Sequence, residues 1–415
     1  MIELARFEDI LIHTPSALSP EVLFERSARF GFSQPSEVEA FAWVMELGAQ
    51  IQGLAGERLV IKGGAATQLY LSLEKQRASV DLDLLSLMNR REVGELLNDV
   101  SKRLTPLHPY FIFKEYVPIK PEVALPMQSY FVNVPAALSQ VRAEASGPPG
   151  RWVKVDFLYL DEPLSICNLS GRSTFALDLV FAPCSVAVGS LIGDKLLTLA
   201  TESIGIPKGR AADLPKHLYD LDHLTRLPMD ESMMRDICQA IQVLVPQESV
   251  YRDLQVGIPA VLGHIRRTLD QWAILDLGAV GAEVKGHLSA FQGNYLRADA
   301  HLPLYGWAIR ALRLKFVLDC VEAALLEGRW SAYQQLRRAD ELEAAIRAEQ
   351  LEPRERGRHR HEVREVFLGR FSHLTGLPKR QFKGRAPERI YWQMVNFENL
   401  GALEQIVMQG GVTRL

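Results

Sequence analysis

Two glycines and two aspartates stand close together in the sequence, in an order suited to phosphate and metal chemistry. Gly63-Gly64 is followed, after sixteen residues, by Asp81-Leu82-Asp83. Glycines at the start of a helix let backbone N–H groups approach an anion, and the helix N-terminus favours negative charge. Carboxylates two residues apart can converge on a hard cation such as Mg²⁺, which bridges the phosphates of a nucleoside triphosphate. The spacing therefore predicts a site for nucleotide phosphates and metal.

A third aspartate lies inside another strand-like run. From Trp152 to Leu158 apolar and polar residues alternate, which places Lys154 and Asp156 on the same face. If this strand neighbours the first, three carboxylates could hold two metal ions about 3.5–4 Å apart, one activating an acceptor hydroxyl and one supporting the leaving pyrophosphate. The alternative is a strand-end carboxylate in an ordinary salt bridge.

The elements that must position these residues follow from the spacing of apolar residues. Val80, Leu82 and Leu84 share one face and the two aspartates the other, as in a half-buried strand. The same reasoning predicts a helix with Ser36 as N-cap and Glu39 completing a capping box, a buried strand over 59–61, a helix over 65–73, strands over 79–85, within 110–134 and over 152–158, and helices over 90–104, 185–201, 214–224, 312–326 and 336–346.

The order of these elements predicts an α+β protein. The chain has 415 residues, enough for two or three domains. Strands and helices mix up to about residue 228, and the pattern beyond it is mainly helical, with no repeat of fixed period. We predict an α/β domain with a mixed sheet over residues 1–228 and a helical domain over residues 229–415.

Four ordered segments resemble a known family. Val60–Gly64 followed by Arg77–Asp83 resembles the nucleotidyltransferase-like toxins of the AbiEii/AbiGii family, which includes the MenT-type toxins of toxin–antitoxin pairs. Gly193–Ala200 resembles the family's DKLxAL helix, and Lys216–Leu221 resembles its RDLYDL segment. The resemblance covers about two fifths of the chain. It implies the polymerase-β-like nucleotidyltransferase fold for the first domain.

The resemblance also implies roles for particular residues. Asp81 and Asp83 would be metal ligands, to which the strand pattern adds Asp156. Lys195 is suited to clamp a triphosphate because an ammonium acts as a point charge, and Asp220 could orient it. The predicted catalytic set is Asp81, Asp83, Asp156, Lys195 and Asp220, and the predicted nucleotide-binding set is Lys62, Gly63, Gly64, Arg77 and Ser79.

Two positions depart from the family's pattern. Ala65 stands where a threonine usually follows the glycine pair, so a hydroxyl ligand is missing unless Thr67 supplies it. His217 replaces the first acid of the RDLYDL segment. Both departures favour a degenerate, non-catalytic scaffold over an enzyme to a small degree, whereas the intact aspartates and Lys195 oppose that reading.

The net charge of −3 hides a basic segment over residues 354–389, which carries +7 and leaves −10 for the rest of the chain. Such a segment suits a polyanion, and aromatic residues between the cations suit unstacked bases. The predicted RNA-binding residues are Arg354, Arg356, Arg358, Arg360, Lys379, Arg380, Lys383 and Arg385, and the interleaved rings are Phe367, Phe371, Phe382, Tyr391 and Trp392. The alternatives are a solvated helix face with the rings in a core, or a dock for an acidic antitoxin.

Composition excludes several classes of protein. With 47% hydrophobic and 23% charged residues the chain is globular, neither disordered nor fibrous. It has no run of eighteen apolar residues that would span a membrane, and its four scattered cysteines form no zinc or disulfide pattern. The start, MIELARFEDI, has no signal-peptide layout, so we expect a cytoplasmic protein.

Together these features predict a Mg²⁺-dependent nucleotidyltransferase that moves a nucleotidyl group from an NTP to an acceptor hydroxyl. The expected acceptor is RNA, such as a tRNA 3′ end, and the expected role is the toxin of a toxin–antitoxin or phage-defence pair, with an antitoxin as partner. The alternatives are an antibiotic-type enzyme with a small-molecule acceptor, and a non-catalytic scaffold that binds nucleotide or a partner protein.

Overall fold

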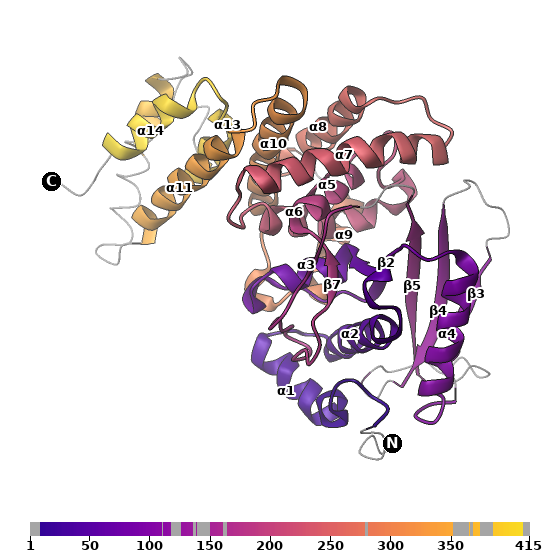
Figure 1. Ribbon diagram of the computed structural model, residues 1–415. Coiled ribbons are helices and arrows are strands. Elements are labelled where there is room, and N and C mark those ends of the chain that lie inside the picture. Colours follow the sequence, from indigo (N-terminus) through magenta and orange to yellow (C-terminus); the bar gives the residue numbers. More distant parts are fainter. Residues whose placement is uncertain are drawn as a thin grey trace.

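The computed structural model describes residues 9–109, 111–117, 126–135, 138, 150–160, 164–278, 281–351, 365, 368–373 and 385–409. These residues form one mixed seven-stranded sheet with helices around it, which confirms the predicted α+β class (Figure 1). The strands are β1 (Leu59–Lys62), β2 (Asp81–Ser86), β3 (Lys114–Tyr116), β4 (Met127–Val134), β5 (Arg151–Tyr159), β6 (Ile166–Asn168) and β7 (Cys184–Val186). Their order is β3-β4-β5-β2-β1-β7-β6.

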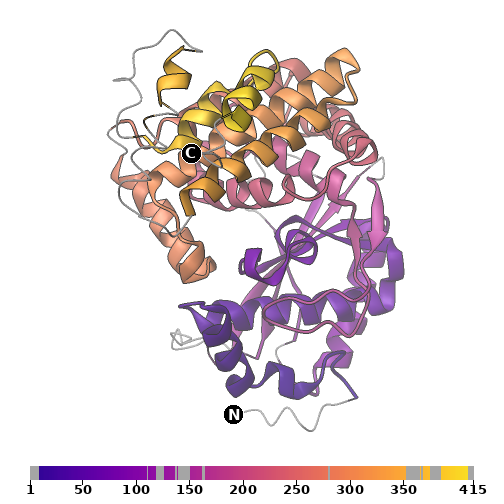
Figure 2. The same cartoon turned by 90° about the vertical axis from the view of Figure 1, so that its left-hand side faces the viewer.

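Helices precede, interrupt and follow the strands. They are α1 (Pro20–Phe30), α2 (Pro35–Ala55), α3 (Gly63–Tyr70), α4 (Arg90–Leu104), α5 (Val188–Thr198), α6 (Leu214–Leu224), α7 (Glu231–Tyr251), α8 (Ile258–Ala273), α9 (Ala282–Tyr295), α10 (Leu304–Glu327), α11 (Ala332–Leu351), α13 (Pro387–Met394) and α14 (Leu400–Gln409). A short 3₁₀ helix, η5 (Lys208–Asp213), leads into α6. The helices from α5 onward gather at one end of the sheet, above the N-terminal half (Figure 2).

The sheet has one apolar and one polar face at its centre. Leu82 and Leu84 are fully buried, whereas Asp81 and Asp83 are half-buried on the other side of β2, as the alternation predicts. The buried helix α2 packs on the apolar face against β1, β2 and β5, with Gly48 lying against Leu82. The carboxylates therefore point away from the main core.

Pairing of β5 with β2 brings the third predicted aspartate to the same place. The two strands run parallel, and the register sets Asp156 directly opposite Asp83 and Lys154 opposite Asp81. On the other side, β1 runs antiparallel to β2 and sets Lys62 opposite Asp83. Residues opposite one another on neighbouring strands share a face, so these five side chains line one patch of the sheet.

Two local predictions are wrong. The helix α2 begins at Pro35, directly after Gln34, and Ser36 makes no cap; the Glu39 carboxylate accepts hydrogen bonds from the Leu138 N–H at 3.2 and 3.1 Å, so it completes no capping box. The start of the helix predicted over 185–201 is instead β7, because Ser185 pairs in parallel with Ile61 in the interior of the sheet.

The predicted domain boundary near residue 228 lies between α6 and α7. Helix α5, before it, packs along α7, after it, and α6 packs against α10. The division into residues 1–228 and 229–415 stays a prediction, and the two parts share helix contacts next to the sheet. No helix in the described part of the chain is long and apolar enough to cross a membrane.

The glycine turn after β1 offers a test of the local geometry. Gly63 has φ +67°, and a methyl group there would collide with the Asp83 carboxylate. We expect Gly63→Ala to lower the free energy of unfolding by about 1–3 kcal/mol, because a left-handed backbone is costly for alanine. Gly53→Ala, in α2 with open space around it, should raise it by about 0.5–1 kcal/mol. Urea unfolding measures both, and equal effects would contradict the account.

Candidate active site

A cavity of about 660 Å³ lies between the polar patch of the sheet and helices α5, α6, α7 and α9. It brings together every residue of the two predicted sets except Asp220, which lies directly behind its wall. Its lining includes Lys62, Gly63, Gly64, Arg77, Ser79, Asp81, Asp83, Asp156 and Lys195. These residues come from sequence segments more than a hundred residues apart, and only the fold assembles them.

The floor of the cavity is acidic. Burial and the neighbouring Asp156 raise the pKa of Asp83, and burial likewise raises the pKa of Asp81. Asp156 Oδ2 accepts a hydrogen bond from Lys154 Nζ at 2.6 Å, while its Oδ1 is buried without a partner. The carboxylates thus repel one another, and one buried oxygen is left for a ligand.

This donor set suits Mg²⁺ shared with a substrate. Within the described residues no three His, Cys, Asp or Glu side chains close around one point as a complete metal site. Mg²⁺ commonly takes one or two carboxylates and completes its shell with water and substrate phosphates, so an open set of hard oxygens fits it. Metal ligation by Asp81, Asp83 and Asp156 stays a prediction.

A buried carboxylate organises the opposite wall. Asp220 Oδ1 and Oδ2 each accept a hydrogen bond from the Arg77 guanidinium at 2.7 Å, and Oδ2 also accepts one from Lys195 Nζ at 2.8 Å. Burial alone would raise the pKa of Asp220, but the two cations lower it well below its ordinary 3.8. Two cations share one anion, so positive charge remains facing the cavity.

Other acids in the wall have cations of their own. Asp194 pairs with Lys62 at 3.2 Å, and Asp213 pairs with Arg210 at 2.7 Å and with Lys216 at 2.9 Å. Burial acts to lower the pKa of Lys62, but Asp194 and Asp83 raise it overall. Each of these cations has an acidic partner, and the excess positive charge of the wall comes from Arg77 and Lys195, which share Asp220. This charge faces floor carboxylates that repel one another, which is the asymmetry a metal–triphosphate complex would match.

Several lining residues were not predicted from the sequence. They are Lys154, Arg210, Lys216, His217, Arg252 and, on α9, His287, Phe291 and Tyr295. Lys154 could have been found, since it shares its strand face with Asp156. The α9 residues carry no sequence signal; the hydrogen bond from the Ala78 N–H to the Tyr295 carbonyl, at 3.0 Å, brings them to the cavity.

The two departures from the family pattern have structural explanations. Thr67 does not replace the missing hydroxyl, because its Oγ1 donates to the Gly63 carbonyl of its own helix at 2.9 Å. His217 lines the cavity, and its Nδ1 is buried without a partner. Burial and the nearby Lys195 lower the pKa of His217, so a neutral ring stands where the family usually has an acid.

The α6 helix also faces the C-terminal helices. Asp222, two residues after Asp220, points to the other side and pairs with Arg310 and Arg313 of α10, both at 3.3 Å. Arg313 is fully buried and also donates to Thr225 Oγ1 at 2.7 Å. The site helix is therefore held from both sides by buried ion pairs.

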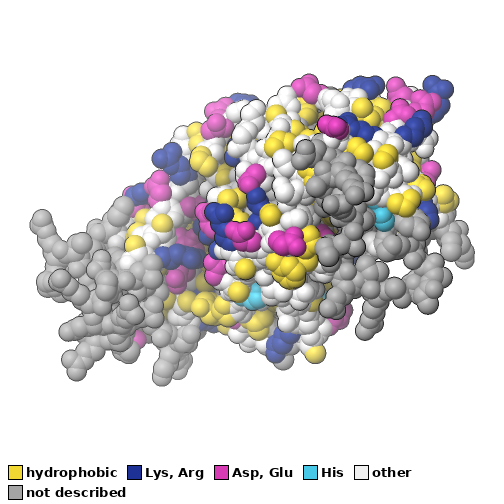
Figure 3. Space-filling model, turned by 90° about the horizontal axis from the view of Figure 1, so that it is seen from below, with side chains coloured by type: hydrophobic (Ala, Val, Ile, Leu, Met, Phe, Trp, Pro, Cys, Tyr) yellow, Lys and Arg dark blue, Asp and Glu magenta, His cyan; other side chains and the backbone are white. Residues whose placement is uncertain are grey.

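Most of the predicted RNA-binding residues lie outside the described residues: Arg354, Arg356, Arg358, Arg360, Lys379, Arg380 and Lys383. Arg385 is described and donates to Gln393 Oε1 at 3.0 Å. Of the interleaved rings, Phe371, Tyr391 and Trp392 are buried in the helical core, so the prediction that they stack on bases is wrong. On the face seen in Figure 3, acidic and basic side chains are interspersed.

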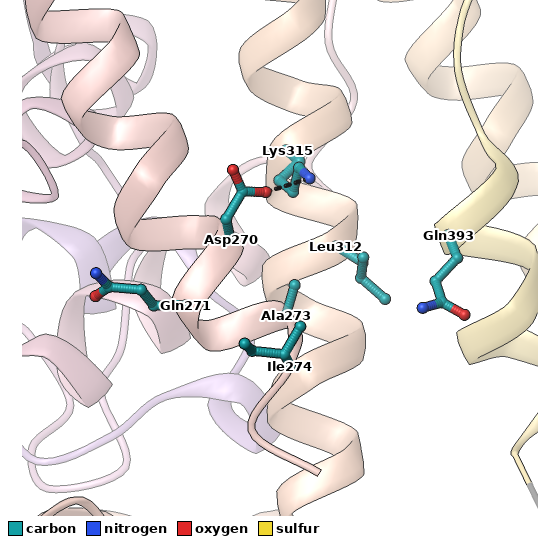
Figure 4. Close-up of a pocket in the computed structure, with 7 residues that line it drawn as sticks. All are labelled: Asp270, Gln271, Ala273, Ile274, Leu312, Lys315 and Gln393. Atoms are coloured by element: carbon teal, nitrogen blue, oxygen red, sulfur yellow. Dashed lines mark ion pairs between the residues drawn. The ribbon is translucent and has the colours of Figure 1, made fainter. Parts of the chain in front are cut away.

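A second hollow of about 430 Å³ lies between α8, α10 and α13 and shares no lining residue with the cavity (Figure 4). Lys315 and Asp270 at its rim form an ion pair, and the floor is apolar, with Ala273 and Leu312. It contains none of the predicted catalytic or nucleotide-binding residues.

Comparison with known protein families matches residues 49–311 to the family described as "Nucleotidyl transferase AbiEii toxin, Type IV TA system", which is well over half of the chain. The chain belongs to this family. The resemblance is confirmed: the protein is a nucleotidyltransferase with the role of a toxin in a type IV toxin–antitoxin system, and the family implies an antitoxin as partner. The match includes every residue of the cavity named above.

Other comparisons are more remote. The crystal structure of an antigenic nucleotidyltransferase-like protein from Paracoccidioides brasiliensis is similar at a TM-score of 0.29 and 14% identity, covering 55% of this chain and 98% of that chain. That similarity assigns no residue. Comparison with curated proteins gave no match.

Removal of the negative charge of Asp220 should destabilise the enzyme. Asp220→Asn leaves Arg77 and Lys195 buried without a carboxylate, so we expect the free energy of unfolding to fall by about 3–5 kcal/mol. Asp99→Asn, on the exposed face of α4, should change it by less than about 0.5 kcal/mol. Urea unfolding at neutral pH measures both, and similar small losses would contradict a structural role for Asp220.

The same carboxylate predicts a pH dependence of stability. The folded-state pKa of Asp220 is lowered, so its contribution is fully present above its ordinary value of 3.8 and is lost as the pH falls below it. Between about pH 5 and pH 3 the wild-type enzyme should therefore lose more stability than Asp220→Asn. Parallel slopes in urea unfolding over that range would show that Asp220 is not the group responsible.

Proposed function

We propose that this enzyme catalyses a Mg²⁺-dependent transfer of a nucleotidyl group from an NTP to a hydroxyl of RNA, with a tRNA 3′ end as the acceptor. The observation that carries the proposal is the charge arrangement of the cavity. Carboxylates in register on adjacent strands face a wall of cations, some of which share a single buried anion. Such a cavity complements a triphosphate on one side and hard cations on the other.

The phosphates of the NTP would lie against the glycine turn and the cation wall. A Cβ at Gly64 would collide with Ser79 Oγ and lie 3.3 Å from a guanidinium nitrogen of Arg77, so only glycine lets these two side chains lie this close to the N-terminus of α3. Lys195 and Lys62 supply point charges from α5 and β1. This set supports triphosphate binding from several sides.

Mg²⁺, when bound by Asp81, Asp83 and Asp156, would neutralise the phosphates and lower the pKa of the acceptor hydroxyl. The chain's own residues do the rest. The acceptor oxygen forms a bond to the α-phosphorus, the α–β phosphoanhydride bond breaks, and pyrophosphate leaves toward Lys195. The hydroxyl proton passes to water, because Oδ1 of Asp156, the buried oxygen that has no partner, would be needed to hold the metal.

RNA is the acceptor that the charge distribution favours. The segment over residues 354–389 carries +7 in a chain with a net charge of −3, and cations are what a polyanionic acceptor needs. An acidic antitoxin could bind the same segment and thereby compete with RNA. A small-molecule acceptor needs no such segment.

The test is transfer of label. Wild-type enzyme, incubated with α-labelled NTPs, Mg²⁺ and total RNA, should label RNA, and Asp83→Asn should lower the rate at least 100-fold because it removes a charge from the floor. Asp99→Asn serves as the matched control, since this acid is exposed on α4. Omission of Mg²⁺ should abolish transfer by the wild-type enzyme.

Each alternative has its own outcome. If label enters a small alcohol or an antibiotic but never RNA, the acceptor is a small molecule and not RNA. Binding of NTP without transfer to any acceptor would indicate a non-catalytic scaffold. Transfer by Asp83→Asn at the wild-type rate would contradict the assignment of the floor.

A further inference from the structure

The polar patch of the sheet continues beyond the cavity toward the outer edge. Strands β5, β4 and β3 lie beside β2 in that order, and β3 is the last strand (Figure 1). The register sets Lys154 of β5 opposite Phe131 of β4, and Phe131 opposite Lys114 of β3. These side chains therefore share the face that carries Asp156.

Aromatic rings and lysines alternate on this extension. Tyr116 is 55% exposed and meets the Phe131 ring edge-on, with centroids 6.0 Å apart. Trp152 is 42% exposed, and Lys114 Nζ lies 5.3 Å from the centre of its ring. Lys154 connects this surface to the cavity through its contact with Asp156 at 2.6 Å. We name Lys114, Tyr116, Phe131, Trp152 and Lys154 the edge platform.

We infer that the edge platform binds the unpaired 3′ end of the RNA acceptor and guides its terminal hydroxyl to Asp156; this inference rests on the proposed function. Two features identify the occupant. The surface is continuous with the catalytic cavity, and its cations alternate with flat rings, which complements phosphates and unstacked bases together. From Trp152 to Asp156 the strand covers about 13 Å. Aromatic side chains on an open sheet face can stack two or three bases.

The platform favours a single strand over a duplex. Rings that stand on an open sheet can stack only on bases that are not already stacked within a helix. The platform also differs from the basic segment over residues 354–389, whose one ring among the described residues, Phe371, is buried. The segment supplies charge for the body of the RNA, and the platform supplies the contacts to its end.

The test combines binding and transfer. Fluorescence anisotropy with a 5′-labelled single-stranded RNA of twelve nucleotides, without NTP, should show a Kd about 10- to 100-fold higher for the Tyr116→Ala/Trp152→Ala double variant. Transfer of label to the same RNA should fall in parallel. Trp152→Phe should restore most of the affinity, because it keeps a ring. Lys114→Gln should reduce the dependence of Kd on salt.

Matched controls separate the platform from exposed aromatic residues in general. Tyr305→Ala on α10 and Phe24→Ala on α1 remove rings that are 49% and 54% exposed and do not line the cavity, and they should leave binding unchanged. A blunt-ended duplex of the same sequence should bind equally to wild type and to the double variant. Unchanged urea unfolding midpoints establish that the variants are folded.

The outcomes distinguish the two proposals. If wild-type enzyme labels RNA and the double variant labels and binds it equally well, the role inferred for the edge platform is wrong and the proposed function stands. If the Kd of the double variant rises by the same factor for duplex and for single-stranded RNA, the inferred preference for an unpaired end is wrong. If wild-type enzyme labels no RNA, both proposals are overturned.

Discussion

The site depends on one buried carboxylate that holds two cations. Asp220 is completely buried, and removal of a charge from water is tolerated only when partners compensate it. Its partners, Arg77 and Lys195, come from the segment before β2 and from α5, so one ion cluster joins three segments that are far apart in sequence. Because two cations share it, the cluster is positive toward the cavity and opposes the carboxylates of Asp83 and Asp156. The acidic floor and the basic wall therefore face each other across the cavity as complementary charges.

The geometry of α6 explains why the helical part belongs to the catalytic unit. Residues two apart on a helix point to different sides, so Asp220 faces the cavity while Asp222 faces α10. Arg313, fully buried, fixes the far side of the helix, and α10 thereby keeps Asp220 in position without touching a substrate. The family match runs to residue 311, so it includes Arg310 at the start of α10 and ends before Arg313.

The local sequence pattern predicted individual residues and strands of the site, whereas the pairing of distant strands determined which residues lie next to one another. The alternation around Asp81 and Asp83 predicted their strand and their common face, and the resemblance predicted Lys195 and Asp220. Nothing in the sequence specified that Asp156 would lie opposite Asp83, because register between strands seventy residues apart follows from the whole sheet. The platform was missed for the same reason: its rings become neighbours only through the pairing of β3, β4 and β5. Rings near residue 391 were assigned to RNA on composition, whereas they fill the core between helices.

The central claim is that the acidic floor and the basic wall together bind a metal–triphosphate complex. Calorimetric titration of the enzyme with a non-hydrolysable nucleoside triphosphate, with and without Mg²⁺, tests this claim most directly, because it measures the Kd of the triphosphate. The account predicts that Mg²⁺ tightens binding to the wild-type enzyme, and that this gain disappears in Asp83→Asn and persists in Asp99→Asn. Triphosphate affinity that responds neither to Mg²⁺ nor to Asp83→Asn would contradict it.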